Sequence, residues 1–196
     1  MRKFIVFGVL SLALCVAASA SLQQGSPSPS LSPIFGTLVN FDDQPTGNAV
    51  SATQYVGVGV SSISDAFNQL YYYSGTQSYP NYVGTGGGVG WSMDTTITLA
   101  FATNQIGIGL AGPGTVTLTA YDVNGNVVEG STFAFATNDY WYFTEATYDI
   151  QSLRIQAGFI AIDDLQFNAG TPEPSSLLLL GSGVVGLAGY LRRRLS

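Results

Sequence analysis

The sequence predicts an all-β fold, an antiparallel β-sandwich of the jelly-roll-like or immunoglobulin-like kind. Three observations predict it. The central region is rich in Val, Ile, Thr, Tyr, Phe and Gly and lacks the Leu/Ala/Glu/Lys pattern of helices. Apolar residues recur there at every second position, which is the period of a half-buried strand. Glycine-rich turns separate these runs, as in sandwiches built from many short strands.

The strands follow from this alternation, element by element. Apolar positions with a period of two predict three successive strands: Ile97, Leu99 and Phe101; Ile106, Ile108 and Leu110; Val116, Leu118 and Ala120. Asn124-Gly125 then predicts a hairpin turn, because both residues tolerate positive φ, and Val127-Val128 opens the return strand. Three later segments predict further strands: 140–143, 152–156 and 158–167. The order of the strands does not follow from the sequence.

The first 20 residues have the pattern of a secretory signal peptide. Met1-Arg2-Lys3 is basic, an apolar run follows to Ala18, and Ala18 and Ala20 are the small residues that signal peptidase recognises. We therefore expect the Sec translocon and signal peptidase as partners, with cleavage after Ala20. Cleavage there removes Cys15, so disulfides do not support the mature chain.

Residues 21–33 are rich in Ser and Pro and predict a linker with too little apolar content to fold. Residues 34–168 are long enough to form one β-sandwich domain with its own core. Residues 169–196 begin with a short spacer and contain three successive features. They are Pro172-Glu173-Pro174, the uncharged stretch 175–191, and Arg192, Arg193 and Arg194.

The uncharged stretch predicts a single transmembrane helix. Its 17 residues would span about 25 Å as a helix, near the lower limit for a bilayer core of about 30 Å. The three arginines favour a cytoplasmic position, which places the domain on the other side of the membrane. Signal peptide and anchor thus predict the same topology. A plain C-terminal anchor with a basic stop is the alternative interpretation.

This C-terminal pattern resembles the PEP-CTERM sorting signal of Gram-negative bacteria. Pro172-Glu173-Pro174, the apolar helix and the terminal arginines occur in the order of that signal. The resemblance implies recognition by an exosortase, a membrane peptidase that cleaves near the Pro-Glu-Pro. It also implies a transient inner-membrane anchor with the body outside the cytoplasm, and then delivery to the cell surface or the extracellular polysaccharide matrix.

Composition excludes several classes of function. Between residues 21 and 171 the chain has one positive side chain, Arg154, against eleven negative ones, a net charge of −10. This charge repels phosphate backbones, so we expect no nucleic-acid partner. The chain has no histidine, and its mature part would have neither cysteine nor lysine. Zinc sites, Ser-His catalysis and Schiff-base chemistry are excluded, and only carboxylates or tyrosines remain for an enzyme.

Two aspartate pairs are candidate metal ligands. Asp42 and Asp43 lie near the start of the domain, and Asp163 and Asp164 lie near its end. First and last strands of a sandwich are often neighbours, and at least one carboxylate of the late pair should enter an apolar setting. The arrangement resembles the structural calcium site of β-sandwich carbohydrate-binding modules, which implies Ca²⁺ as a cofactor. Solvated or backbone-capping aspartates are the alternative. Asp122-Val123-Asn124-Gly125-Asn126 departs from a calcium loop and favours a hairpin turn.

Aromatic residues in a Gly/Ser/Pro-rich stretch are candidate glycan contacts: Tyr72, Tyr79, Tyr82 and Trp91. Alternation between core and surface is the alternative. We therefore expect a non-enzymatic surface or matrix protein, associated with exopolysaccharide or biofilm. A secreted carbohydrate-binding module is a specialised version of it. A glycoside hydrolase that uses Asp163 or Asp164 with Glu145 is the alternative from another class, although no spacing nominates the pair of carboxylates that it needs.

Overall fold

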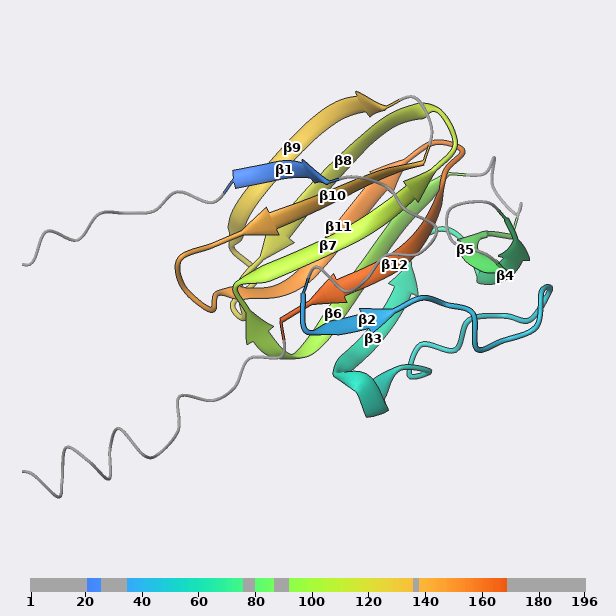
Figure 1. Ribbon diagram of the computed structural model, residues 1–196, viewed down its shortest axis with the longest axis horizontal. Helices are drawn as coiled ribbons and strands as arrows, with labels where there is room; N and C mark the ends of the chain where they lie inside the picture. Colours follow the sequence, from blue (N-terminus) through green and yellow to red (C-terminus); the bar gives the residue numbers. More distant parts are fainter. Residues whose placement is uncertain (1–20, 26–34, 76–79, 87–91, 136–137, 169–196) are drawn as a thin grey trace, which may run out of the picture.

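The computed structural model describes residues 21–25, 35–75, 80–86, 92–135 and 138–168. Twelve strands form two antiparallel sheets of seven and five strands, which confirms the predicted all-β class (Figure 1). The only helical element among these residues is a 3₁₀ turn, η1 (Val56–Val58), which ends at Gly59 with φ of 97°. The part of the chain that the structure describes has no helix long and apolar enough to cross a membrane.

The seven-stranded sheet, here called sheet A, has β12 near its centre. Its order is β1 (Ser21–Gly25), β10 (Asp139–Thr144), β7 (Gln105–Ala111), β12 (Ala161–Phe167), β5 (Asn81–Thr85) and β4 (Leu70–Ser74), and β2 (Thr37–Val39) also pairs with β12. One edge of β12 is divided between two partners. Its first residues pair with β5 and its last three with β2, while β7 runs along its other edge.

The five-stranded sheet, here called sheet B, carries the predicted central hairpin. Its order is β3 (Val60–Asp65), β6 (Met93–Thr103), β11 (Ile150–Ala157), β8 (Gly114–Tyr121) and β9 (Val127–Phe135). The β8–β9 turn is the predicted Asp122–Asn126 segment. Gly125 has φ of 80°, and the Asp122 carboxylate accepts hydrogen bonds from the backbone N–H groups of Asn124 and Asn126, each at 2.8 Å.

The alternating apolar positions face one shared core. Ile106, Ile108 and Leu110 of sheet A and Ile97, Leu99, Val116, Leu118 and Ala120 of sheet B are all buried in the same cluster. In an antiparallel sheet the neighbours of such residues along the strand point to the other face. The remaining residues of β7, with Tyr71 and Tyr73 of β4 and Tyr82 and Gly84 of β5, therefore lie on the outer face of sheet A.

Residues 21–25 correct the predicted linker. We expected 21–33 to remain without structure, but Ser21–Gly25 forms β1, which pairs along its whole length with β10. Backbone hydrogen bonds to a strand already in place need little apolar content, and Leu22 alone packs against the core. The rest of the predicted linker, the signal peptide at 1–20 and the segment 169–196 lie outside the residues that the structure describes.

A bulge interrupts β12 at the late aspartate pair. The register with β7 shifts between Asp163, which pairs with Gly109, and Gln166, which pairs with Gly107. Asp164 takes up the extra residue with φ of 46°, in the left-handed region that Asp tolerates better than most side chains. Both carboxylates are buried, which confirms that at least one enters the protein interior.

Candidate functional site

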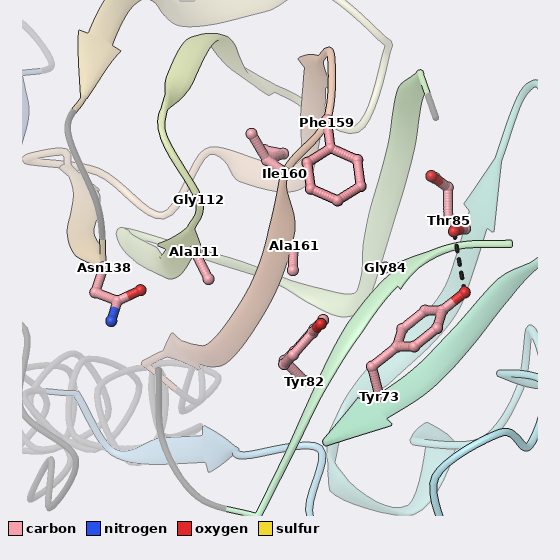
Figure 2. Close-up of a pocket in the computed structure, with 10 residues that line it drawn as sticks. All are labelled: Tyr73, Tyr82, Gly84, Thr85, Ala111, Gly112, Asn138, Phe159, Ile160 and Ala161. Atoms are coloured by element: carbon pink, nitrogen blue, oxygen red, sulfur yellow. Dashed lines mark hydrogen bonds between the residues drawn. The ribbon is translucent and has the colours of Figure 1, made fainter. Parts of the chain in front are cut away.

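A cavity of about 350 Å³ lies on the outer side of sheet A (Figure 2). Its floor is a row of small residues on three neighbouring strands. Ala161 of β12 is directly opposite Gly84 of β5 on one side and Ala111 of β7 on the other. Residues opposite each other in an antiparallel sheet share a face, so this row leaves a depression where three large side chains would otherwise stand.

Two stacked tyrosines form one wall of the cavity. Tyr73 and Tyr82 are opposite each other on β4 and β5, and their ring centroids are 5.7 Å apart with the planes 25° from parallel. The Tyr73 hydroxyl donates to the Thr85 carbonyl oxygen at 3.2 Å, which fixes that ring. Burial raises the pKa of Tyr73 above its ordinary value, and the neighbouring Tyr82 and Tyr71 add to the effect, so the phenol stays neutral.

Glycines hold the tyrosine rings of this hairpin flat against the sheet. A Cβ atom on Gly75 would stand 1.8 Å from a Tyr82 ring carbon, and one on Gly86 would stand 2.2 Å from a Tyr71 ring carbon. Each ring thus occupies the space above a glycine that lies just beyond the end of the neighbouring strand. The glycine-rich composition of this region therefore has a packing role, because aromatic rings cover glycines across strands.

The other walls come from two turns. Phe159 and Ile160 lie between β11 and β12, and Phe159 is 68% exposed. Gly112, at φ of 93°, turns the chain beside the Phe159 carbonyl. Asn138, at φ of 51°, stands at the far end near Ala111, and Figure 2 shows the Phe159 and Tyr82 side chains on opposite sides of Ala161.

Of the four predicted glycan contacts, one lines the cavity. Tyr82 does, whereas Tyr79 and Trp91 lie outside the residues that the structure describes. Tyr72 is fully buried in the core, so it cannot contact a glycan, and its prediction is corrected. The reason is parity: Leu70 and Tyr72 share the inner face of β4, which leaves Tyr71 and Tyr73 outside. The Tyr72 hydroxyl lies 3.0 Å from the Tyr55 hydroxyl, which donates a hydrogen bond to the Asp43 carboxylate at 2.6 Å.

Of the lining residues that were not predicted as contacts, three have aromatic or amide side chains: Tyr73, Asn138 and Phe159. The parity of β4 was a usable signal for Tyr73, because Leu70 marks the inner face. Phe159 follows Gly158 at a turn, and an aromatic residue beside a turn glycine is a usable signal for an exposed contact. Asn138 had no such signal, since its place depends on the pairing of β10 with β7.

The early aspartate pair makes hydrogen bonds to protein groups. The Asp42 carboxylate accepts from the Asn81 backbone N–H at 2.9 Å and from the Asn40 side-chain amide at 2.8 Å. Asp43 accepts from Tyr55. Strand β2, just before this pair, lies beside the last strand, β12, whereas the first strand of the structure, β1, pairs with β10.

The predicted calcium ligands do not form a cluster of carboxylates within the described residues. Among the described residues, no three carboxylates come together in a group that could hold a metal ion, although Asp42, Asp43, Asp163 and Asp164 are all described. The bulge in β12 gives the physical reason for the late pair, because it turns the Asp164 backbone N–H onto the Asp163 carboxylate at 2.8 Å. Asp42 and Asp163 thus match the alternative of backbone-capping aspartates.

Glu145 does not join the late aspartates either. It lies just beyond β10 and is buried, and its Oε1 atom has no hydrogen-bond partner among the described residues. Burial raises the pKa of Glu145 above its ordinary value, and the charges of Glu129 and Asp149 raise it further. Thr144, the residue before Glu145, pairs with Gln105, whereas Asp163 pairs with Gly109, so Glu145 and Asp163 lie at different positions along β7.

The single arginine of the domain is engaged by one carboxylate. Arg154 donates from Nε to Asp94 Oδ1 at 2.6 Å and from Nη2 to Asp94 Oδ2 at 2.7 Å. These bonds lower the pKa of Asp94 below its ordinary value. Because residues 21–171 contain no other Lys or Arg, the remaining acidic charge has no further side-chain cation to balance it.

Comparison with solved structures gives distant likenesses of fold. An arabinose-bound α-L-arabinofuranosidase, MgGH51, is 10% identical over 65% of this chain and 25% of that chain, with a TM-score of 0.41. The enzymatically active domain of tailspike protein 4 of bacteriophage CBA120 is 11% identical over 55% of this chain and 19% of that chain, with a TM-score of 0.36. This chain thus matches a quarter or less of either structure. No curated protein matches its sequence.

The predicted sorting residues, Pro172, Glu173, Pro174 and Arg192 to Arg194, lie outside the described residues, as do Ala18 and Ala20. A family model, the PEP-CTERM protein-sorting motif, matches residues 171–194 and covers all six of these sorting residues. The resemblance stated from the sequence is therefore confirmed: the chain carries a PEP-CTERM protein-sorting motif, the signal of an exported protein that an exosortase processes.

Proposed function

We propose that this protein is a non-enzymatic component of the cell surface or extracellular matrix, sorted by an exosortase and associated with exopolysaccharide. The observation that carries the proposal is the sorting motif at residues 171–194. In this proposal the Sec translocon and signal peptidase act on residues 1–20. The segment 175–191 then holds the chain in the inner membrane, with the domain outside the cytoplasm, until cleavage near Pro172-Glu173-Pro174 releases it.

The make-up of the cavity favours binding without turnover. A glycoside hydrolase places two carboxyl groups about 5–10 Å apart on either side of the scissile bond. None of the ten lining residues carries a carboxylate. The carboxylates nominated from the sequence are on separate elements: Asp163 in β12 and Glu145 beyond β10. A secreted carbohydrate-binding module is therefore the favoured second function, ahead of a carboxylate-dependent hydrolase.

The strand order supports a jelly-roll assignment for the sandwich. Strands β2, β12, β7 and β10 are consecutive neighbours in sheet A, and β6, β11, β8 and β9 are consecutive neighbours in sheet B. We infer from this order two four-stranded layers whose connections cross between sheets, as in a double Greek key. Strands β1 and β3 and the β4–β5 hairpin are then additions at the edges.

Mass spectrometry of the terminal peptides tests the sorting proposal. The protein is recovered from its host, with membrane and extracellular fractions kept separate. We expect an extracellular chain that starts at Ser21 and ends near Pro172 to Pro174. A chain that keeps Arg192 to Ser196 in the membrane fraction would contradict exosortase cleavage. Replacement of Pro172-Glu173-Pro174 by three alanines is the matched control, and should retain the chain in the membrane.

A further inference from the structure

We propose that the cavity on the outer face of sheet A binds a neutral pyranose unit of a polysaccharide, with Tyr82 and Phe159 as its stacking surfaces. The inference rests on the proposed function, because it names the ligand class for a protein sent into a polysaccharide matrix. The cavity volume of about 350 Å³ is within the range of roughly 300–1,000 Å³ of small-molecule sites.

The aromatic walls suit the apolar faces of a sugar ring. A pyranose presents its axial C–H groups on one face, and these weakly positive hydrogens are attracted to the negative face of an aromatic ring. The Tyr73–Tyr82 stack offers a broad, fixed surface, since the Tyr73 hydroxyl is bonded to Thr85 and the Tyr82 ring rests on Gly75. Phe159, on the other side of Ala161, offers an exposed ring (Figure 2).

The floor allows a flat ligand to approach the sheet closely. Gly84, Ala161 and Ala111 lie side by side and present at most a methyl group each. Adjacent strands are about 4.8 Å apart, so this row spans roughly 10 Å, about the length of a disaccharide. A row of small residues between raised aromatic rings therefore has the shape of a shallow trough for part of a chain, not of a closed chamber.

Two polar groups are available to form hydrogen bonds with the hydroxyl groups of a sugar. Neither the Asn138 side-chain amide, at one end of the trough, nor the Tyr82 hydroxyl makes a hydrogen bond among the described residues. An amide offers two donors and one acceptor oxygen, and a phenol offers one donor and one acceptor. This combination matches the alternating donor and acceptor character of sugar hydroxyls.

The charge of the domain selects a neutral glycan over an acidic one. Recognition of a uronate or sulfate needs a cation, preferably a guanidinium. The single arginine between residues 21 and 171 is engaged in two hydrogen bonds with Asp94, and it does not line the cavity. Residues 21–171 carry a net charge of −10, so the domain as a whole would repel an anionic polysaccharide.

Binding to immobilised oligosaccharides tests the proposal. The full chain is purified in detergent micelles, and its binding to cellohexaose, mannohexaose and xylohexaose is measured by biolayer interferometry, with oligogalacturonate as the acidic comparison. We expect binding to at least one neutral oligosaccharide and none to oligogalacturonate. Phe159→Ala and Tyr82→Ala should each weaken binding about tenfold or more, and Tyr82→Phe, which keeps the ring, should lose much less.

Matched controls separate the site from general surface effects. Phe67 is 59% exposed, close to the 68% of Phe159, and Tyr148 is a second exposed aromatic, and neither lines the cavity. Phe67→Ala and Tyr148→Ala should bind like the unmodified chain. Three outcomes would overturn the proposal: no binding to any neutral oligosaccharide, unchanged binding in Phe159→Ala and Tyr82→Ala, or preferential binding to oligogalacturonate. Because this assay uses uncleaved protein, its result is independent of whether exosortase processing occurs.

Discussion

Replacement of Gly107 by alanine tests the packing of the outer face of sheet A. A Cβ atom at this position would stand 2.5 Å from the Tyr140 hydroxyl oxygen and 2.9 Å from two atoms of its ring. Tyr140 is fully buried, so its ring cannot swing into solvent to make room. Overpacking of this kind costs about 1–3 kcal/mol. This cost is partly offset, because alanine inside a strand is more stable than glycine by about 0.5–1 kcal/mol.

The net expectation for Gly107→Ala is a loss of about 1–2 kcal/mol. For a chain of this size that corresponds to a fall in Tm of roughly 2–8 °C, measured by near-ultraviolet circular dichroism. Gly130→Ala in β9 is the matched control, because its Cβ would meet Thr119 at an ordinary 3.4 Å. That variant should be as stable as the unmodified chain or slightly more stable.

A double variant identifies the clash itself. Tyr140→Phe removes the hydroxyl oxygen that stands nearest to the added methyl group, and this hydroxyl has no hydrogen-bond partner within the described part of the chain. Gly107→Ala combined with Tyr140→Phe should therefore recover about half of the lost stability, a coupling of the kind that contacting residues show. The reasoning is refuted if Gly107→Ala unfolds at the temperature of the unmodified chain, or if Tyr140→Phe brings no recovery.

Three further predictions concern carboxylates. Burial raises the pKa of Glu145 in the folded state above its pKa in the unfolded state. As pH rises from the unfolded-state pKa through the folded-state pKa, ionisation of Glu145 therefore destabilises the fold. Glu145→Gln should raise Tm at pH 7 and leave it unchanged near pH 3. Arg154→Met should cost about 1–2 kcal/mol at pH 7 in urea unfolding, discounted because the arginine side chain is 38% exposed. Since the lowered pKa of Asp94 means that this stabilisation is lost as pH falls through the folded-state pKa, the two proteins should converge in acid. Asp65→Ala should lower Tm more than Asp122→Ala. The Asp65 carboxylate joins β3 to the start of β6 by accepting hydrogen bonds from the Asp94 N–H and the Thr95 hydroxyl, whereas the Asp122 carboxylate accepts hydrogen bonds only within its own turn. Equal falls in Tm would contradict this.

Local pattern was sufficient to predict the core strands. Side chains alternate between the two faces of a strand, so the apolar positions 106, 108 and 110 had to share one face, and the structure buries all three. The β8–β9 turn was also predictable, because Asn124-Gly125 has few other conformations that suit two flanking strands. Both predictions depend on residues close together in the chain.

Features set by distant pairing could not be predicted. The cavity floor exists because Ala161 meets Gly84 and Ala111, residues 77 and 50 positions away, and no local signal reports that register. The bulge at Asp164 likewise depends on how β12 fits β7. Tyrosine has both apolar and polar parts, so the run Tyr71 to Tyr73 did not show which residues face the core. Tyr72 was therefore assigned to the surface, although it is buried.

Strand β1 has a consequence for the solubility of the domain. It covers the outer edge of β10, whose residues Tyr140 to Phe143 are all aromatic. An uncovered edge strand presents unpaired N–H and C=O groups and is a template for pairing with another chain. The first five described residues, with two glutamines in their sequence, thus act as a protective cap. A chain trimmed beyond Gly25 would expose the aromatic edge, and edge-to-edge association of domains would follow.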